Sequence, residues 1–176
     1  MRDHSHQEAL YRSWLADHGG IVFKVTRSFA RTPSEAAELD QEVRVQLWKS
    51  VPAFGGDAKP ATWIYRVCLN TALTWRRGTK RHENHFDPVI DLAHVHANGA
   101  TPAETAGERE IVERLYAAIQ SMPDLDRAII LLSLDGIAHR EIAEVMGMTE
   151  GHVGVALMRA RQRLANLMKG IAHELK

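Results

Sequence analysis

Apolar side chains recur at the spacing of an α-helix along nearly the whole chain, and no segment alternates convincingly as a β-strand would. In residues 35–50, Leu39, Val43 and Leu47 recur every four positions, after a plausible helix start at Pro33-Ser34. Residues 60–80 fit a longer helical template, with Pro60 in the first turn, where its missing N–H costs nothing. The positions that fit this template are Ile64, Val67, Cys68, Thr71, Ala72 and Trp75. The sequence therefore predicts an all-α fold.

Glycine and proline mark the expected breaks between helices. Residues 7–30 are expected to form a helix pair or a bent helix, interrupted at Gly19-Gly20, and residues 51–60 to form a structured loop. Between residues 82 and 107 no helical period is sustained, which predicts a flexible linker. We therefore expect two small helical domains, at 1–81 and 108–176, joined by the linker 82–107; the length of 176 residues allows this division.

The segment 139–164 has the pattern of a helix-turn-helix. A short helix with Ile142, Ala143 and Met146 on one face would end at Gly147, a residue suited to a left-handed C-cap. Thr149 can cap the next helix, whose expected buried stripe is Val153, Leu157, Ala160, Leu164 and Leu167. Arg159, Arg161 and Arg163 follow in the same helix, where they can reach phosphates or guanine edges. The pattern predicts a duplex-DNA reader, although ordinary helical hairpins can imitate it.

The formal net charge of zero conceals a strong segregation of charge along the chain. Residues 59–82 hold six basic and no acidic side chains, residues 83–150 hold four basic and thirteen acidic, and residues 151–176 hold five basic and one acidic. We expect the two basic segments to act independently, because charges more than a Debye length of ~8 Å apart are largely screened. Each basic segment could then meet a polyanion by itself.

Aromatic side chains are interleaved with the basic residues of 59–82. Trp63, Tyr65 and Trp75 lie within that segment and Phe54 just before it. Rings on which bases stack, among cations that follow phosphates, are what a single-strand binder needs, and such stacking is worth ~1–3 kcal/mol per base. The alternative is that Trp63 and Trp75 simply fill the core of a helical domain.

Several classes of protein are disfavoured by what the sequence lacks. Cys68 is the single cysteine, which excludes an intramolecular disulfide framework and fits a reducing compartment. There is no apolar run of about 18 residues and no signal-peptide core at the N-terminus, so a cytoplasmic protein without membrane insertion is expected. No phosphate loop, zinc-protease or nucleophile motif appears, so neither an enzyme nor a cofactor is expected. The histidines of the linker (His82, His85, His94 and His96) have metal-like spacings but no rigid element to hold them.

Taken together, these segments resemble the extracytoplasmic-function class of bacterial RNA polymerase sigma factors. The resemblance rests on residues 36–48, 54–77, 121–147 and 151–164, which occur in the family's order on either side of the linker. It implies a first domain that binds the polymerase clamp helices and melts the minus-ten promoter element. It implies a second domain that reads the minus-thirty-five element, and it also implies an anti-sigma factor as a regulatory partner.

The resemblance carries roles to individual residues. Those that match the polymerase-binding helix are Leu39, Gln41, Glu42, Leu47 and Trp48, of which Leu39 and Leu47 also suit the core. Those that match the minus-ten and melting region are Lys59, Trp63, Tyr65, Arg66, Asn70, Arg76 and Arg77, with Asn70 able to donate to and accept from a flipped base. Those assigned to the minus-thirty-five element are His152, Val155, Arg159, Arg161 and Arg163.

The chain departs from the family pattern in two places. Gly154, Val155 and Ala156 stand where basic or hydroxyl residues are usual, so only apolar contact with thymine methyls, from Val155 or Ala156, is available there. Asp40 occupies a position that is commonly apolar. These departures leave two alternatives beside a working sigma factor: a DNA-binding regulator that uses only the helix-turn-helix, and a degenerate sigma-like module that binds an anti-sigma factor.

Overall fold

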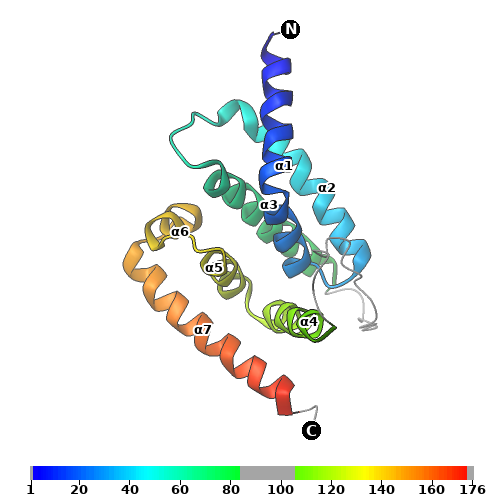
Figure 1. Ribbon diagram of the computed structural model, residues 1–176, viewed down its shortest axis with the longest axis vertical. Coiled ribbons are helices and arrows are strands. Elements are labelled where there is room, and N and C mark those ends of the chain that lie inside the picture. Colours follow the sequence, from blue (N-terminus) through cyan, green and yellow to red (C-terminus); the bar gives the residue numbers. More distant parts are fainter. Residues whose placement is uncertain (1, 84–105, 174–176) are drawn as a thin grey trace.

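The computed structural model describes residues 2–83 and 106–173, and all regular structure in these ranges is helical. An N-terminal unit contains three α-helices and a C-terminal unit four (Figure 1). The elements are α1 (Arg2–Phe29), α2 (Pro33–Ser50), a 3-10 turn η1 (Val51–Ala53), α3 (Pro60–Glu83), α4 (Ala106–Ser121), α5 (Asp124–Leu134), α6 (His139–Met146) and α7 (Glu150–His173). The prediction of an all-α chain with two helical units is confirmed.

The N-terminal unit forms because α1, α2 and α3 each turn an apolar stripe toward the other two. Leu39, Val43 and Leu47 of α2 are buried, as are Ile64 and Cys68 of α3. Helix α2 begins where the sequence predicted, since Thr32 accepts a hydrogen bond from the Glu35 amide (3.1 Å) and Pro33 takes the first turn.

One expectation about the N-terminal unit was wrong. Helix α1 runs without a break through Gly19 and Gly20, where an interruption was predicted. Each glycine costs about 1 kcal/mol of helix propensity relative to alanine. The next turns bury Ile21, Val22 and Val25 almost completely, and burial of a Val or Ile side chain is worth ~1.5–3 kcal/mol. Packing therefore outweighs the local preference to break.

The C-terminal unit contains the predicted helix-turn-helix. Helix α6 ends at Gly147 in the left-handed conformation (φ 65°), and Thr149 accepts a hydrogen bond from the His152 amide at the start of α7 (3.3 Å). The stripe of α7 is buried at Val153, Leu157 and Ala160, while Leu164 and Leu167 are partly buried against the same core. Turn, cap and stripe are all confirmed.

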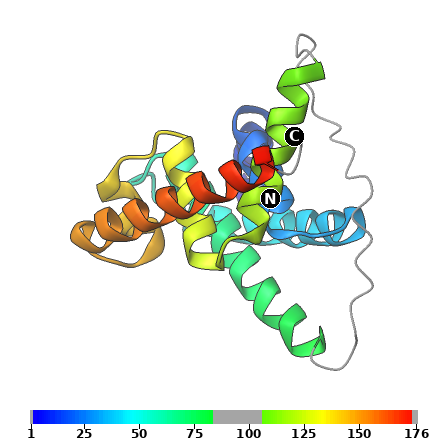
Figure 2. The ribbon, with the colours of Figure 1, turned by 90° about the horizontal axis from the view of Figure 1, so that it is seen from below.

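The two units lie against each other and share one hydrophobic core (Figures 1 and 2). Helix α3 contacts α5 and α6, and the C-terminal half of α1 contacts α4 and α5. Gln120 of α4 donates to the carbonyl oxygens of Arg27 (2.7 Å) and Ala30 (3.1 Å) at the end of α1.

Most of the predicted linker, including its other histidines beyond His82, lies outside the described residues. Within the described ranges, no helix combines the length and apolar character needed to cross a bilayer.

Candidate nucleic-acid and polymerase interfaces

The exposed face of α2 carries the polar residues of the predicted polymerase site. Gln41 and Glu42 are exposed, whereas Leu39 and Leu47 point into the core with 0% and 1% of their surface accessible. Asp40 is bonded by Arg44 one turn later, which explains how a carboxylate is held at a position that is commonly apolar. The face that a partner can touch is therefore mainly polar, with Glu42 beside the exposed Arg44, Lys49 and Val45.

Trp48, also predicted to touch polymerase, joins α2 to α1. Its ring packs edge-on against Tyr11 with 5.4 Å between centroids, and its carbonyl oxygen accepts a hydrogen bond from Gln7 (3.0 Å). The side chain is half-buried. In this structure Trp48 positions the helix as well as contributing to its surface.

A groove of about 870 Å³ runs between α2 and α3. Asn70 is exposed on its α3 wall, and Trp75 donates from its indole nitrogen to Glu38 across the groove (3.4 Å). The α2 wall includes the carboxylates of Glu38 and Glu42 and the ammonium of Lys49, and the α3 wall includes the neutral amide of Asn70. Such a surface suits a basic partner on α2, and it leaves Asn70 accessible for a hydrogen-bonding ligand.

Trp63 packs in a row of aromatic side chains, so its ring is not a free surface on which a base could stack. Its ring lies 5.6 Å from that of Phe54, which in turn lies 5.2 Å from the buried Trp14. Its indole nitrogen donates to Ser50 (3.2 Å). The ring is half-buried, so one part of it fixes the 51–60 loop and another part remains accessible.

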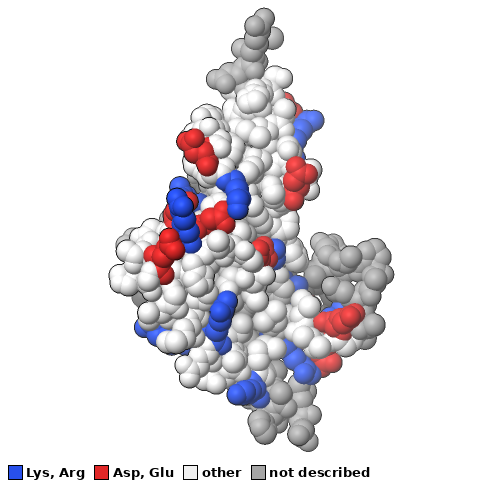
Figure 3. Space-filling view, turned by 60° about the vertical axis from the view of Figure 1, so that its left-hand side comes forward, with Lys and Arg blue, Asp and Glu red and all other residues white. Residues whose placement is uncertain are grey.

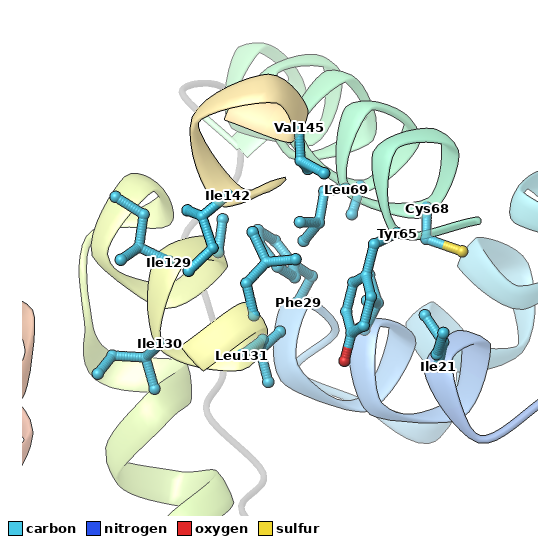
Figure 4. Packing of buried hydrophobic residues seen from close by; sticks show 14 of the residues in the cluster. Ile21, Phe29, Tyr65, Cys68, Leu69, Ile129, Ile130, Leu131, Ile142 and Val145 are labelled. Atoms are coloured by element: carbon cyan, nitrogen blue, oxygen red, sulfur yellow. The ribbon is translucent and has the colours of Figure 1, made fainter. Parts of the chain in front are cut away.

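Tyr65, predicted to contact the minus-ten element, is buried between the two units in this structure. Only 1% of its surface is accessible, and its hydroxyl donates to Asp135 in the turn between α5 and α6. Burial, and then the bond to Asp135, raise the pKa of the phenol well above its usual value. Figure 4 shows the ring beside Cys68, Phe29 and Ile21 in the shared core.

The basic side chains of α3 and the loop before it meet the C-terminal unit. Lys59 pairs with Glu141 of α6 (2.9 Å), and Arg66 donates to the carbonyl oxygen of Glu144 (3.1 Å). Folding therefore brings the basic segment 59–82 into direct contact with the acidic segment 83–150. The independent action of the two basic segments stays a prediction. On the face drawn in Figure 3, acidic and basic side chains lie next to one another instead of forming a patch of one sign.

The neighbouring arginines Arg76 and Arg77 have opposite environments. Arg76 is buried, with Nε 3.8 Å from an Asp124 carboxylate oxygen, and its Nε and Nη1 have no hydrogen-bond acceptor among the described residues. Arg77 is exposed and donates to the Thr74 hydroxyl (3.1 Å). Of the two, only Arg77 can reach DNA without a movement of the units.

Helix α7, the predicted DNA-reading helix, exposes all five residues assigned to it, but two of them have partners within the unit. His152, Val155 and Arg159 are exposed, and the exposed Arg161 and Arg163 bind Ser133 (2.9 Å) and Asp126, respectively. Ala156, for which contact with a thymine methyl was considered, is 94% buried in the core and cannot reach a base in this structure. The exposed surface of α7 is therefore mixed, with Met158 (63% exposed) beside the polar residues.

The residues that meet the predicted DNA site from the C-terminal unit were not found by sequence reasoning. They are Asp135, which binds both Tyr65 and Lys24, and Glu141, which accepts from Lys59 and Thr62. The hydrogen bond from Lys59 is the main cause that lowers the pKa of the Glu141 carboxyl, and the positive charge of Lys59 adds to it. The available signal was the acidic excess of residues 83–150 beside the basic excess of 59–82. Among the described residues no group of His, Cys, Asp and Glu is arranged to hold a metal ion.

Comparison with known families accounts for both units. Residues 14–82 match the family described as Sigma-70 region 2, and residues 112–164 match Sigma-70, region 4. The chain is 29% identical over 139 residues to the ECF RNA polymerase sigma-E factor of Escherichia coli K12, covering 75% of this chain and 73% of that protein. It is 28% identical over 149 residues to the protein of the same name from Haemophilus influenzae, covering 81% and 78%.

Two solved structures share the fold. The sigma factor RpoE in complex with the anti-sigma factor NepR, from Bartonella quintana, superposes with a TM-score of 0.72 at 18% identity, over 92% of this chain and 98% of that one. CnrH in complex with the cytosolic domain of CnrY superposes with a TM-score of 0.64 at 20% identity, over 93% and 90%. Each match spans both helical units of this chain.

Proposed function

The chain belongs to the extracytoplasmic-function group of the sigma-70 family, and from this membership we propose how its residues divide the family's work. Its function is that of a sigma factor, which binds core RNA polymerase, directs it to a promoter and takes part in opening the duplex. The observation that carries this function is the presence of region 2 and region 4 in order, each on its own set of helices. Members of the family are non-catalytic initiation factors, and we assign this chain no catalytic step.

Polymerase binding is assigned to the exposed face of α2. Gln41 and Glu42 supply hydrogen-bond acceptors and negative charge to a basic helical partner. Leu39, Leu47 and Trp48 hold the helix in place from the core side. The α2 wall of the groove, which carries Glu38 and Glu42 beside Lys49, extends the same surface toward α3.

Promoter contacts are assigned to both units. In the first domain (1–81) the candidates for the minus-ten element are Lys59, Trp63, Tyr65, Arg66, Asn70, Arg76 and Arg77. Asn70 and Arg77 are exposed as they stand, and an exposed amide suits the edge of an extruded base. In the second domain (108–176), joined by the linker 82–107, the candidates for the minus-thirty-five element are His152, Val155, Arg159, Arg161 and Arg163.

Regulation by an anti-sigma factor is part of the proposal. Both solved structures with this fold were determined as complexes, and one of those partners is described as an anti-sigma factor. The site of action would be the cytoplasm, where core polymerase and promoter DNA are found. A pull-down of the tagged chain from its source cell, with identification of the bound proteins, tests this part separately.

Run-off transcription with purified core polymerase on a library of promoters tests the function. The chain is expected to support initiation on a subset of templates, and no core binding with no initiation on any template would refute the assignment. Replacement of Gln41 and Glu42 by alanine should weaken core binding at least tenfold without changing the fold. Glu110→Ala in α4 is the matched control, because Glu110 is exposed and its ion pair among the described residues is with Arg114 of the same helix.

A further inference from the structure

The surface where the two units meet coincides with the predicted minus-ten site. Four of the seven residues predicted for the minus-ten site bind groups of the C-terminal unit. The pairs are Lys59 with Glu141, Tyr65 with Asp135, Arg66 with the Glu144 carbonyl and Arg76 with Asp124. Three of these four partners are carboxylates, and the fourth is a carbonyl oxygen. Anionic oxygens therefore stand where the phosphates of a bound strand would be expected.

Asp135 is the centre of this contact. Its Oδ2 accepts from the Tyr65 hydroxyl of α3 and from the Lys24 ammonium of α1, so one carboxylate bridges two helices of the N-terminal unit. It lies in the short turn between α5 and α6, close to the positive-φ Gly136. The side chain is 24% exposed, which leaves it within reach of solvent and of competing ions.

Apolar packing lies directly beneath the polar contacts. Figure 4 shows Leu69 of α3 facing Val145 of α6, with Phe29 of α1 among Leu131 and Ile142. The same interface buries Arg76 with two N–H groups unsatisfied among the described residues, which is unfavourable. The contact thus combines apolar burial with a buried ion pair, Arg76 and Asp124, whose hydrogen bonding is incomplete, and this lowers the cost of separating the units.

The polymerase-binding face is not covered by this contact. Gln41, Glu42 and Val45 on α2 remain exposed, and so does Asn70 across the groove. The C-terminal unit reaches α3 and α1 but makes no contact with α2 among the described helices. In this arrangement the chain can meet polymerase while much of its minus-ten surface is occupied.

We propose that this arrangement is self-inhibited: the carboxylates at the α5–α6 end of the C-terminal unit compete with promoter DNA for Lys59 and the basic residues of α3, and Asp135 and Glu141 hold the unit there. The proposal rests on the proposed function, since it takes Lys59, Tyr65, Arg66 and Arg76 as DNA-binding residues. Separation of the units frees these side chains, and the phosphates of the promoter strand then replace the carboxylates. Salt should weaken both contacts, because each depends on opposite charges near the surface.

The test compares two double variants of the full chain. Asp135→Ala with Glu141→Gln removes two carboxylates from the interface, and glutamine retains the reach of Glu141 to the Ala138 backbone at the start of α6. Glu110→Ala with Glu150→Gln removes two carboxylates elsewhere and serves as the control for net charge. Labels at Ala9→Cys in α1 and Ala165→Cys in α7 report the separation of the units by energy transfer, because both positions are exposed whereas Cys68 is buried.

The DNA probe is a fluorescent single-stranded DNA of mixed sequence, measured by anisotropy without polymerase. The interface variant should bind about tenfold more tightly than the control variant, equivalent to ~1.4 kcal/mol, with a loss of energy transfer. The single variant Glu141→Gln perturbs folding least, and its gain in DNA affinity, on a logarithmic scale, should be about a third of that of the double variant. Equal DNA affinity in the interface and control variants would overturn the proposal, even where wild-type chain supports run-off transcription. Failure of run-off transcription with a positive result here would instead refute the proposed function alone.

Discussion

Replacing Arg127 should be among the most damaging single changes to this chain. Arg127, at the start of α5, is 97% buried, and its guanidinium caps the end of α4. It donates to the carbonyl oxygens of Ile119 (3.2 Å), Gln120 and Met122 (2.8 Å) where α4 ends and the helix itself supplies few donors. The Ile119 carbonyl also accepts from the Met122 amide (3.1 Å). It also lies 5.0 Å above the ring of Phe29, so it touches both units.

The size of the effect follows from these contacts. Arg127→Met keeps the apolar stem but removes the donor of the Gln120 and Met122 carbonyls, at about 1–3 kcal/mol each, whereas the Ile119 carbonyl keeps the Met122 amide. The substitution also removes the free-energy cost of burying a cation. That cost is seen in the pKa of Arg127, which burial lowers to about 10. We take about 1 kcal/mol for each of the two carbonyls and treat the lost cation–π contact as offset by the released cost of burying the cation. The free energy of unfolding should then fall by ~2 kcal/mol.

Urea denaturation followed by circular dichroism measures this loss. Arg140→Met is the control, because Arg140 is 80% exposed and its pair with Glu144 should contribute less than ~0.5 kcal/mol. Arg127→Lys should fall between the two, since a single ammonium cannot reproduce the planar fork that reaches several carbonyls. If Arg127→Met lay within 0.5 kcal/mol of the wild-type chain, the assignment of Arg127 as the cap of α4 would be wrong.

Three further outcomes follow from the same structure. Arg77→Ala should lower the salt slope of promoter binding by the holoenzyme by about one unit, whereas Arg76→Ala should chiefly change the energy transfer between the units; equal slopes for both variants would contradict this difference. Gly147→Ala should destabilise the C-terminal unit by ~1 kcal/mol in urea, because φ is 65° there, and an unchanged midpoint would argue against that turn. Cys68 should react with a thiol reagent at pH 8 about a thousandfold more slowly than the unfolded chain, because burial raises its pKa to about 12, and rapid labelling of the native chain would show that the core opens there.

The sequence predicted most of the helices because their signals are local. The four-residue spacing in α2, the glycine after α6 and the threonine before α7 act over a few residues, and each was confirmed. The break predicted at Gly19-Gly20 failed because tertiary burial of the following turns overrides local propensity. Helix α3 was expected to bury one stripe, whereas it also buries Tyr65 and Leu69 toward the second unit.

The candidate site was harder to predict because it depends on residues far apart in the chain. Glu141 lies 82 positions after Lys59, and Asp135 lies 70 positions after Tyr65. No local spacing encodes which acid meets which base across a linker, and only the opposite charge totals of the two segments indicate that they are compatible. Which of the assigned residues contact DNA or polymerase stays a prediction.

The position of α3 constrains how this protein can change over evolutionary time. Its neighbours are α1 and α2 on one side and α5 and α6 on the other, so most substitutions along it disturb at least one interface. Asn70, Thr74 and Arg77 are the exception, since their spacing places them on one exposed strip of the helix. Variation should be tolerated on that strip more readily than elsewhere in α3, so new promoter preferences can arise there without loss of the fold. In a saturation-mutagenesis scan of Pro60–Glu83 that measures folding, substitutions at these three positions should be tolerated more often than elsewhere in α3.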